Sequence, residues 1–162
     1  MFRIEPARPQ DVPHVFRLIR ALAEYEKLTH LVCGSEAQLR AELFGARPVI
    51  ECLLGWEGAQ PVGFALFFHN FSTFLARRGL YLEDLFVEPA ARGKGYGKAL
   101  MRRLAQLAVE RGCGRFEWAV LDWNRPAIDF YRALGAEVLP DWRICRLTGD
   151  ALARLAASDS LD

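Results

Sequence analysis

A glycine-rich segment, Arg92-Gly93-Lys94-Gly95-Tyr96-Gly97-Lys98, stands between an apolar strand-like run and a long helix-like repeat. Glycine lets backbone N–H groups approach a ligand closely, and the N-terminus of a helix carries about half a positive charge. Together these properties suit a phosphate or a pyrophosphate. The side chains of Arg92 and Lys98 either attract phosphate as point charges or stay solvated. The competing interpretation of the whole segment is a turn that only reverses the chain.

The two best-known phosphate loops do not fit this spacing. The P-loop pattern places its first glycine on Arg92 and its magnesium-binding hydroxyl on Ala99. The dinucleotide pattern G-x-G-x-x-G places its third glycine on Lys98 or Leu100, depending on the starting glycine. Both patterns therefore fail, and a different phosphate-binding turn has to be considered.

Two adjacent carboxylates, Glu83 and Asp84, interrupt the apolar run at 80–87. A carboxylate is costly to bury alone, so each is paired, hydrated or facing a cationic ligand. Because adjacent residues of a strand point to opposite faces, we expect at most one of them to face a substrate. The alternative is that they are structural carboxylates anchoring the strand end or a neighbouring loop.

A tyrosine, Tyr131, follows Asn124 by seven residues on an expected short helix. Two positions almost two turns apart share a helix face, so both can serve one ligand. The alternative is a core tyrosine whose hydroxyl is satisfied inside the protein. The residues alone leave both interpretations open.

Composition excludes several classes of function. The four cysteines form no C-x-x-C pair, so a zinc site of the usual spacing is excluded and no metal is expected. The formal net charge is only +1, which provides no field for holding nucleic acid or an anionic membrane. The first residues lack a secretory apolar core, and no apolar run could span a bilayer. We expect a soluble, cytoplasmic protein with reduced thiols and no acyl-cysteine intermediate.

The elements that must position these residues follow from hydrophobic periodicity. Strand-like runs lie at 2–5, 49–56, 62–68, 80–87, 115–121 and 142–147, and helical spacing lies at 12–26, 35–44, between the glycine-rich turn and Arg111, at 126–134 and after Thr148. Three consecutive strands favour an antiparallel meander. The chain of 162 residues, 52% of them hydrophobic, is long enough for one sizeable core. The pattern predicts one α/β domain, 1–162, with a mixed sheet.

Five segments in chain order carry a family resemblance over nearly the whole chain. They are Leu-Ala-Glu-Tyr-Glu-Lys-Leu at 22–28, Tyr-Leu-Glu-Asp-Leu-Phe-Val at 81–87, Arg-x-x-Gly-x-Gly at 92–97, Ala-Val-Leu-Asp-Trp-Asn at 119–124, and Asn-Arg-Pro-Ala-Ile-Asp-Phe-Tyr-Arg-Ala-Leu-Gly-Ala at 124–136. They resemble the diamine acetyltransferase family of the GNAT N-acetyltransferase superfamily, and most closely its thialysine Nε-acetyltransferase branch. The resemblance implies the GNAT fold, a mostly antiparallel mixed sheet flanked by helices, in which the fourth and fifth strands splay apart to form an acyl-CoA cleft.

The same resemblance implies a role for each candidate residue. Acetyl-CoA would contact the loop residues Arg92, Gly93, Lys94, Gly95, Tyr96, Gly97 and Lys98, the strand residues Leu85, Phe86 and Val87, and Asn124, Arg125, Pro126, Ala127 and Tyr131. The amine substrate would contact Tyr25, Glu26, Glu83, Asp84, Asp141 and Trp142. Glu83 would remove a proton from the amine, which is mostly ammonium at neutral pH, and Tyr131 would give its phenol proton to the CoA thiolate.

The function implied is transfer of acetyl from acetyl-CoA to the primary amine of a small molecule, by direct attack in a ternary complex. Thialysine or a lysine-like amino acid, ornithine and a short diamine are the expected acceptors. The stretch at 69–74 lacks the acidic residue of the polyamine-acting relatives, which disfavours spermidine. Relatives are homodimers, so a homodimer is expected. Two alternatives stay open: a protein or peptide amine as acceptor, and a CoA-binding regulatory module without turnover.

Overall fold

The computed structural model describes residues 1–159 of the chain. Its contacts divide the chain into two compact units, Met1–Leu121 and Asp122–Asp162. Among the described residues, no helix is both long and apolar enough to cross a membrane. The expectation of a single domain remains a prediction.

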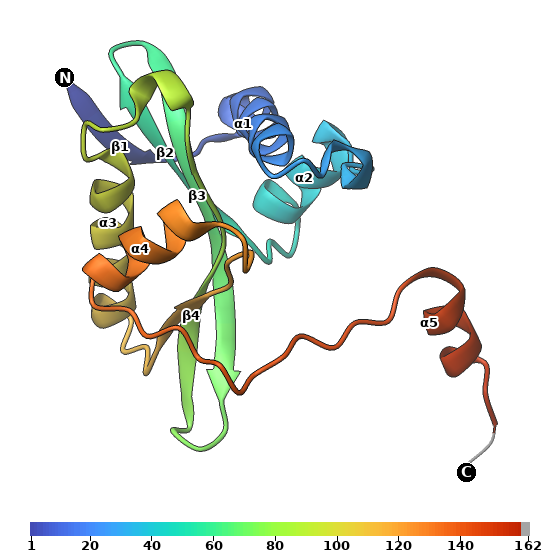
Figure 1. Cartoon of the computed structure of the whole chain (residues 1–162). Helices are drawn as coiled ribbons and strands as arrows, with labels where there is room; N and C mark the ends of the chain where they lie inside the picture. Colours follow the sequence, from blue (N-terminus) through green and yellow to red (C-terminus); the bar gives the residue numbers. More distant parts are fainter. Residues whose placement is uncertain (160–162) are drawn as a thin grey trace. The chain divides into compact units, whose positions relative to one another are not determined.

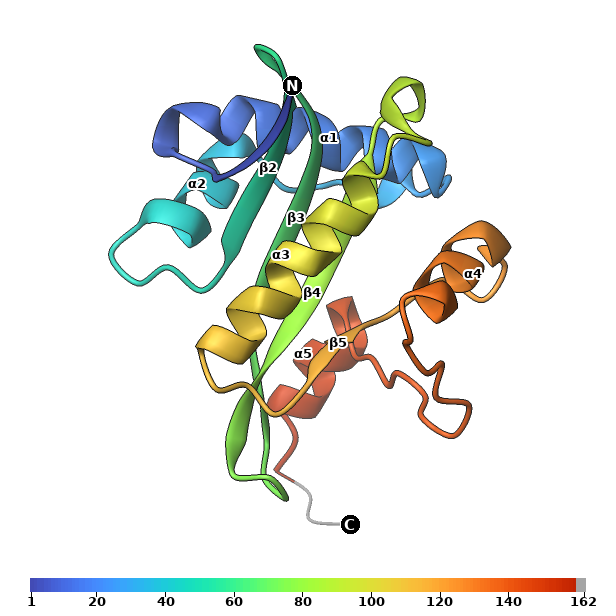
Figure 2. The same cartoon turned by 90° about the vertical axis from the view of Figure 1, so that its left-hand side faces the viewer.

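The first unit contains a five-stranded sheet in the order β1-β2-β3-β4-β5 (Figure 2). The strands are β1 (Phe2–Pro6), β2 (Glu51–Glu57), β3 (Gln60–Ser72), β4 (Arg77–Val87) and β5 (Phe116–Trp118). The first four pair antiparallel, which confirms the predicted meander, and β5 pairs parallel to β4. The strand expected at 115–121 has only three residues, because its register with β4 stops at Leu82↔Trp118.

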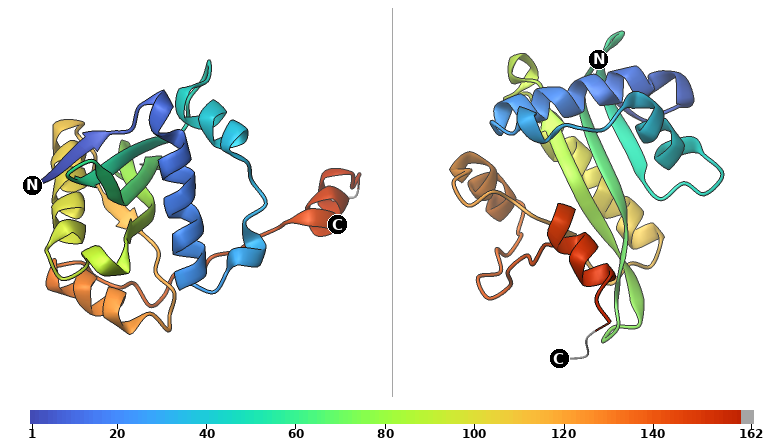
Figure 3. Two further views of the ribbon diagram at one scale, coloured as in Figure 1. Left: turned by 90° about the horizontal axis from the view of Figure 1, so that it is seen from above. Right: turned by 90° about the vertical axis from the view of Figure 1, so that its right-hand side faces the viewer.

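Helices cover both faces of this sheet (Figures 1 and 3). The helices α1 (Val12–Tyr25) and α2 (Glu36–Phe44) lie on one face and α3 (Tyr96–Glu110) on the other. One core cluster joins α1 to the sheet through Val15, Leu18, Leu54 and Phe64. Every residue of β3 from 61 to 67 is buried. A strand covered on both faces must be apolar at every position, which explains the continuous apolar run in the sequence.

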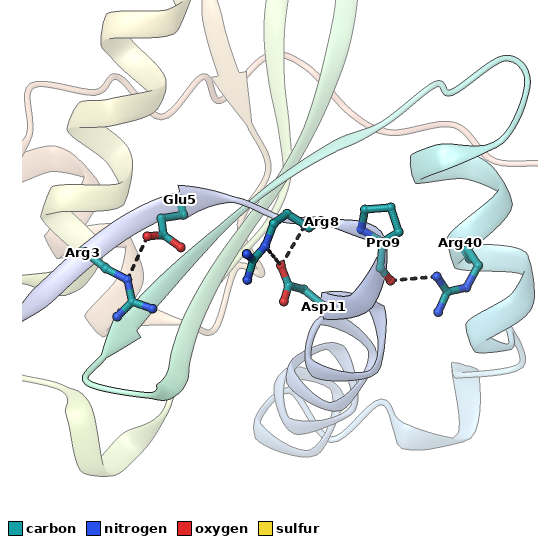
Figure 4. Close-up of polar contacts among 6 residues, drawn as sticks. All are labelled: Arg3, Glu5, Arg8, Pro9, Asp11 and Arg40. Atoms are coloured by element: carbon teal, nitrogen blue, oxygen red, sulfur yellow. Dashed lines mark hydrogen bonds and ion pairs between the residues drawn. The ribbon is translucent and has the colours of Figure 1, made fainter.

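A polar network fixes the point where the chain leaves β1 and enters α1 (Figure 4). The buried carboxylate of Asp11 accepts hydrogen bonds from the backbone N–H of Arg8 at 2.8 Å and from its Nε at 3.2 Å. Arg40 of α2 donates to the carbonyl of Pro9 at 2.7 Å. These contacts hold the start of α1, whose far end carries Tyr25 and Glu26.

The helix α2 begins with the capping box that the sequence predicts. Ser35 Oγ accepts a hydrogen bond from the Gln38 N–H at 3.2 Å, and Gln38 Oε1 accepts one from the Ser35 N–H at 2.9 Å. We expect Ser35→Ala to lower the free energy of unfolding by about 1 kcal/mol. Thermal denaturation should show a fall in Tm of about 2–4 °C. Ser35→Thr keeps the cap and should keep the Tm, whereas an unchanged Tm in Ser35→Ala would contradict the prediction.

The second unit contains α4 (Arg125–Ala133) and α5 (Gly149–Ala156). The helix expected at 126–134 is thereby confirmed, but the strand expected at 142–147 is wrong. All residues from 137 to 150 are exposed, and no strand of the described residues pairs with this segment. Apolar side chains alone do not make a strand, because the backbone N–H and C=O groups need a partner chain.

Candidate active site

A β-bulge in β4 places the two adjacent carboxylates. Leu66 of β3 pairs with Asp84 and the next residue, Phe67, pairs with Leu82, so Glu83 has no partner in the register. A bulge inserts one extra residue and redirects the side chains around it. Leu66 belongs to the core cluster beneath α1, so the register puts Asp84 on the α1 face. Alternation is thus broken between Leu82 and Asp84, and the expectation that at most one of Glu83 and Asp84 faces the substrate remains a prediction.

Two other carboxylates act on Asp84 at this bulge. Asp84 is half-buried, and burial, together with the charges of Glu83 and Glu26, raises its pKa to about 7. Burial also raises the pKa of Glu26, which follows α1. The charges of Glu83 and Glu26 make ionisation of Asp84 harder, so a cation beside Asp84 would be stabilised. Chemically, this group can bind a cation or accept a proton near neutral pH.

The glycine-rich loop leaves open space in front of its backbone. Gly93 and Gly95 have φ of +77° and +82°, and a Cβ added at either position would meet nothing within 4 Å. Gly95 is the N-cap of α3, so the loop ends at a helix N-terminus. Backbone amides that are accessible beside a positive helix end fit an anionic group such as a pyrophosphate.

Two side chains of the loop are held by Glu57, which is not among the residues expected at the site. Lys94 Nζ lies 2.7 Å from a carboxylate oxygen of Glu57, and the Tyr96 hydroxyl donates to the same oxygen at 2.8 Å. These hydrogen bonds lower the pKa of Glu57. The Tyr96 ring also stacks on Phe2 at 3.8 Å. Glu57 ends β2 and lies far away in sequence, so no local pattern reveals it.

Arg92 connects the loop to α1 and β4. Its guanidinium lies over the Tyr25 ring at 4.6 Å and over the Phe86 ring at 5.5 Å, and its Nε donates to the Val87 carbonyl at 2.9 Å. Phe86 itself is buried, so only its backbone is available to a ligand on the strand edge. The structure thus brings together Tyr25, Arg92 and the end of β4, a contact that no local sequence pattern indicates.

The pairing of β4 changes along its length. The parallel strand β5 pairs with Leu80–Leu82 only, and among the described residues no strand pairs with the outer edge of Glu83–Val87. The expected divergence of the fourth and fifth strands is therefore confirmed. An unpaired strand edge offers backbone N–H and C=O groups to an extended ligand.

The second unit carries the remaining candidates. Asn124 is buried, and its Oδ1 accepts from the Ala127 N–H at 3.4 Å, which caps the start of α4 at Arg125 and Pro126. Tyr131 lies on α4, half-buried, with its ring 5.4 Å from that of Phe130. Asp141 and Trp142 are exposed and lie outside every helix and strand. In residues 1–159, no group of three or more His, Cys, Asp and Glu is arranged to hold a metal ion.

The open-edged mixed sheet, the bulged fourth strand and the glycine loop before a helix N-terminus agree with the acyl-CoA-binding fold that the family resemblance implies. A family model described as "Acetyltransferase (GNAT) family" matches residues 17–136. The chain therefore belongs to the GNAT acetyltransferase family and is an acetyl-transfer enzyme. Members of this family use acetyl-CoA as cosubstrate.

Similar proteins cover almost the whole chain. It is 38% identical to L-ornithine N5-acetyltransferase NATA1 of Arabidopsis thaliana, over 93% of this chain and 86% of that protein. It is 40% identical to thialysine N-epsilon-acetyltransferase of Mus musculus, over 95% and 96%. A solved structure, integron cassette protein VCH_CASS6 from the mobile metagenome of V. cholerae, is 28% identical and matches with a TM-score of 0.81, over 97% and 98%.

Proposed function

We propose that this enzyme transfers acetyl from acetyl-CoA to the primary amine of a small cationic molecule. Thialysine or a lysine-like amino acid, ornithine and a short diamine are the acceptors we favour. The observation that carries the proposal is the group of three carboxylates, Glu26, Glu83 and Asp84, at the β4 bulge. Carboxylates that have no ion-pair partner among residues 1–159 suit an ammonium ion, and relatives are named for thialysine and ornithine.

The residues that would hold acetyl-CoA follow from the open backbone groups of the first unit. The amides of residues 93–98 would bind the pyrophosphate, and the free edge of β4 at Leu85 and Val87 would pair with the pantetheine arm. Acetyl-CoA supplies the activated acyl group. In the second unit, residues 124–127 would contact the cosubstrate and Tyr131 would protonate the departing thiolate. Tyr25, Asp141 and Trp142 complete the proposed contacts to the amine.

The proposal is tested by thiol release from acetyl-CoA across thialysine, lysine, ornithine, putrescine, spermidine and aminoalkylphosphonates. Saturable turnover on a short amine, strongest with thialysine or ornithine and weakest with spermidine, is the expected result. Mass spectrometry of treated peptides provides the matched control for a protein acceptor. Acetylated peptides with an inactive amine panel would contradict a small-molecule acceptor, and acetyl-CoA binding without any turnover would contradict an enzymatic role.

We further propose a homodimer, supported by apolar side chains that the second unit leaves exposed. Trp142 and Ile144 are 81% and 72% exposed, and α5, only eight residues long, buries none of its side chains. A helix of that length is marginal without a packing partner. We expect the wild type to have twice the chain mass in light scattering and Trp142→Asp/Ile144→Asp to be a monomer. Val109→Asp, at an equally exposed apolar position of α3, should leave the mass doubled; a monomeric wild type would contradict the proposal.

A cytoplasmic location is proposed from the state of the thiols. All four cysteines are free, and Cys33 and Cys145 are exposed. Unpaired exposed thiols are typical of a reducing compartment. Fractionation of the expressing cells, with the protein recovered outside the cytoplasmic fraction as the contrary result, tests this location.

A further inference from the structure

We propose that Asp84, and not the adjacent Glu83, is the residue that accepts the proton from the amine substrate. The inference rests on the proposed function and assigns its proton-transfer step. The register supports it, because the bulge at Glu83 turns Asp84 onto the α1 face. Burial supports it as well, because Asp84 is half-buried whereas Glu83 is exposed.

No cationic side chain of residues 1–159 pairs with Asp84 to stabilise its negative charge. Within residues 1–159 its carboxylate makes no ion pair and accepts no hydrogen bond from a side chain or backbone donor. Its charged neighbours are Glu83 on the same strand and Glu26 at the end of α1. From β2 it is faced by the thiol of Cys52, whose pKa burial raises far above its usual range, and from β3 by the apolar Leu66.

The guanidinium of nearby Arg92 does not form an ion pair with Asp84. Arg92 lies on the rings of Tyr25 and Phe86 and gives its Nε hydrogen bond to the Val87 carbonyl. Asp84 therefore faces two carboxylates and a neutral thiol, and an ammonium ion would be its first positive partner. Such a carboxylate attracts the protonated amine and then takes its proton.

The chemistry of the amine explains why a raised pKa matters. An alkylammonium has a pKa near 10.4, and an ordinary carboxylate of pKa about 4 is a very weak base toward it. A base works best when its pKa lies near the working pH, and the pKa of Asp84 is raised to about 7. Proton transfer to Asp84 is thus less uphill by about three pKa units than transfer to an exposed carboxylate.

The step balances with one proton on Asp84. The ammonium loses one proton to the Asp84 carboxylate, and the freed nitrogen pair forms the new C–N bond while the C–S bond of the thioester breaks. A second nitrogen-bound proton is lost as the amide forms, and one proton ends on the sulfur of the released thiol. Asp84 returns its proton to water, so each turnover releases one proton.

The pH profile of turnover distinguishes the two carboxylates. In the wild type, kcat/KM should fall below about pH 7, where Asp84 is protonated. We expect Asp84→Asn to lower kcat by about 100-fold or more and to abolish this acidic limb. Glu83→Gln should raise KM by about tenfold, through loss of one attracting charge. It should keep the limb but move it to lower pH, because the Glu83 charge no longer raises the pKa of Asp84. An acidic limb that disappears in Glu83→Gln and persists in Asp84→Asn would overturn the assignment.

Stability provides a readout that does not depend on activity. Because the folded-state pKa of Asp84 is raised, the folded protein holds a proton that the unfolded chain releases, and stability is lost as pH rises toward 7. The Tm of Asp84→Asn relative to wild type should therefore increase from pH 4 to pH 7 and level off above it. A Tm difference that is independent of pH would overturn the inference.

Failure of the inference and failure of the proposed function give different results. A wild type without turnover on any amine overturns the proposed function and the role of Asp84 with it. An active wild type together with an equally active Asp84→Asn variant overturns the role of Asp84 alone.

Discussion

Replacing Gly95 with valine raises the KM for acetyl-CoA at least tenfold, according to the geometry of the loop. Gly95 has φ of +82°, a conformation that costs an L-residue about 1–2 kcal/mol and a β-branched residue more. Its added side chain would occupy the open space before the loop amides. Loss of pyrophosphate binding should leave kcat at saturating acetyl-CoA much less affected, which steady-state kinetics measures directly.

Gly112, just beyond the C-terminal end of α3, provides the matched control. Gly112 has φ of +69°, and a Cβ there would also meet nothing within 4 Å. Gly112→Val should therefore cost a similar amount of stability, about 1–2 kcal/mol, without changing the KM for acetyl-CoA. Equal changes of KM in both variants would mean that the loop acts through helix stability and does not bind the cosubstrate.

The second large effect is expected from Tyr131→Phe, which removes one hydroxyl and keeps the ring packed beside Phe130. Without its phenol proton the thiolate leaves less readily, so kcat should fall by about 100- to 1000-fold. The KM values should change little, because the proton is needed only as the thiol departs. The deficit should shrink above about pH 8.5, where a thiolate is itself stable in water. Thiol release measured from pH 6 to pH 10 tests both statements.

Tyr81→Phe controls for the removal of a tyrosine hydroxyl elsewhere. Tyr81 is half-buried on β4, with its ring 5.1 Å from that of Phe68. Its variant should retain the kcat of the wild type. An equal loss of kcat in the two variants, or full activity of Tyr131→Phe, would remove Tyr131 from the proposed chemistry.

The elements that could be predicted are those with a local cause. The Ser35–Gln38 capping box needs only two residues of one helix turn, and it begins α2 as expected. The buried run of β3 and the glycine turn before α3 are equally local signals. The five motifs along the chain indicated the acetyltransferase family, and the match over residues 17–136 confirms it.

The strand expected at 142–147 shows where local pattern fails. Its apolar residues have strand-like character, but Trp142 and Ile144 are exposed and lack a pairing partner among the described residues. The hydrophobic pattern describes what a segment could bury. Whether a pairing partner is available depends on how the rest of the chain folds.

The sequence by itself determined the kinds of residue available for chemistry, the order of the elements and the glycine loop that frees backbone amides. Only the tertiary structure decided how they combine. Examples are the bulge at Glu83, the ion pair of Glu57 with Lys94, and the stacking of Arg92 on Tyr25. The physical reason is the distance along the sequence over which each kind of interaction acts. Caps, turns and periodicity depend on neighbours within a few residues, whereas strand register and the burial of a carboxylate depend on segments that meet only after folding.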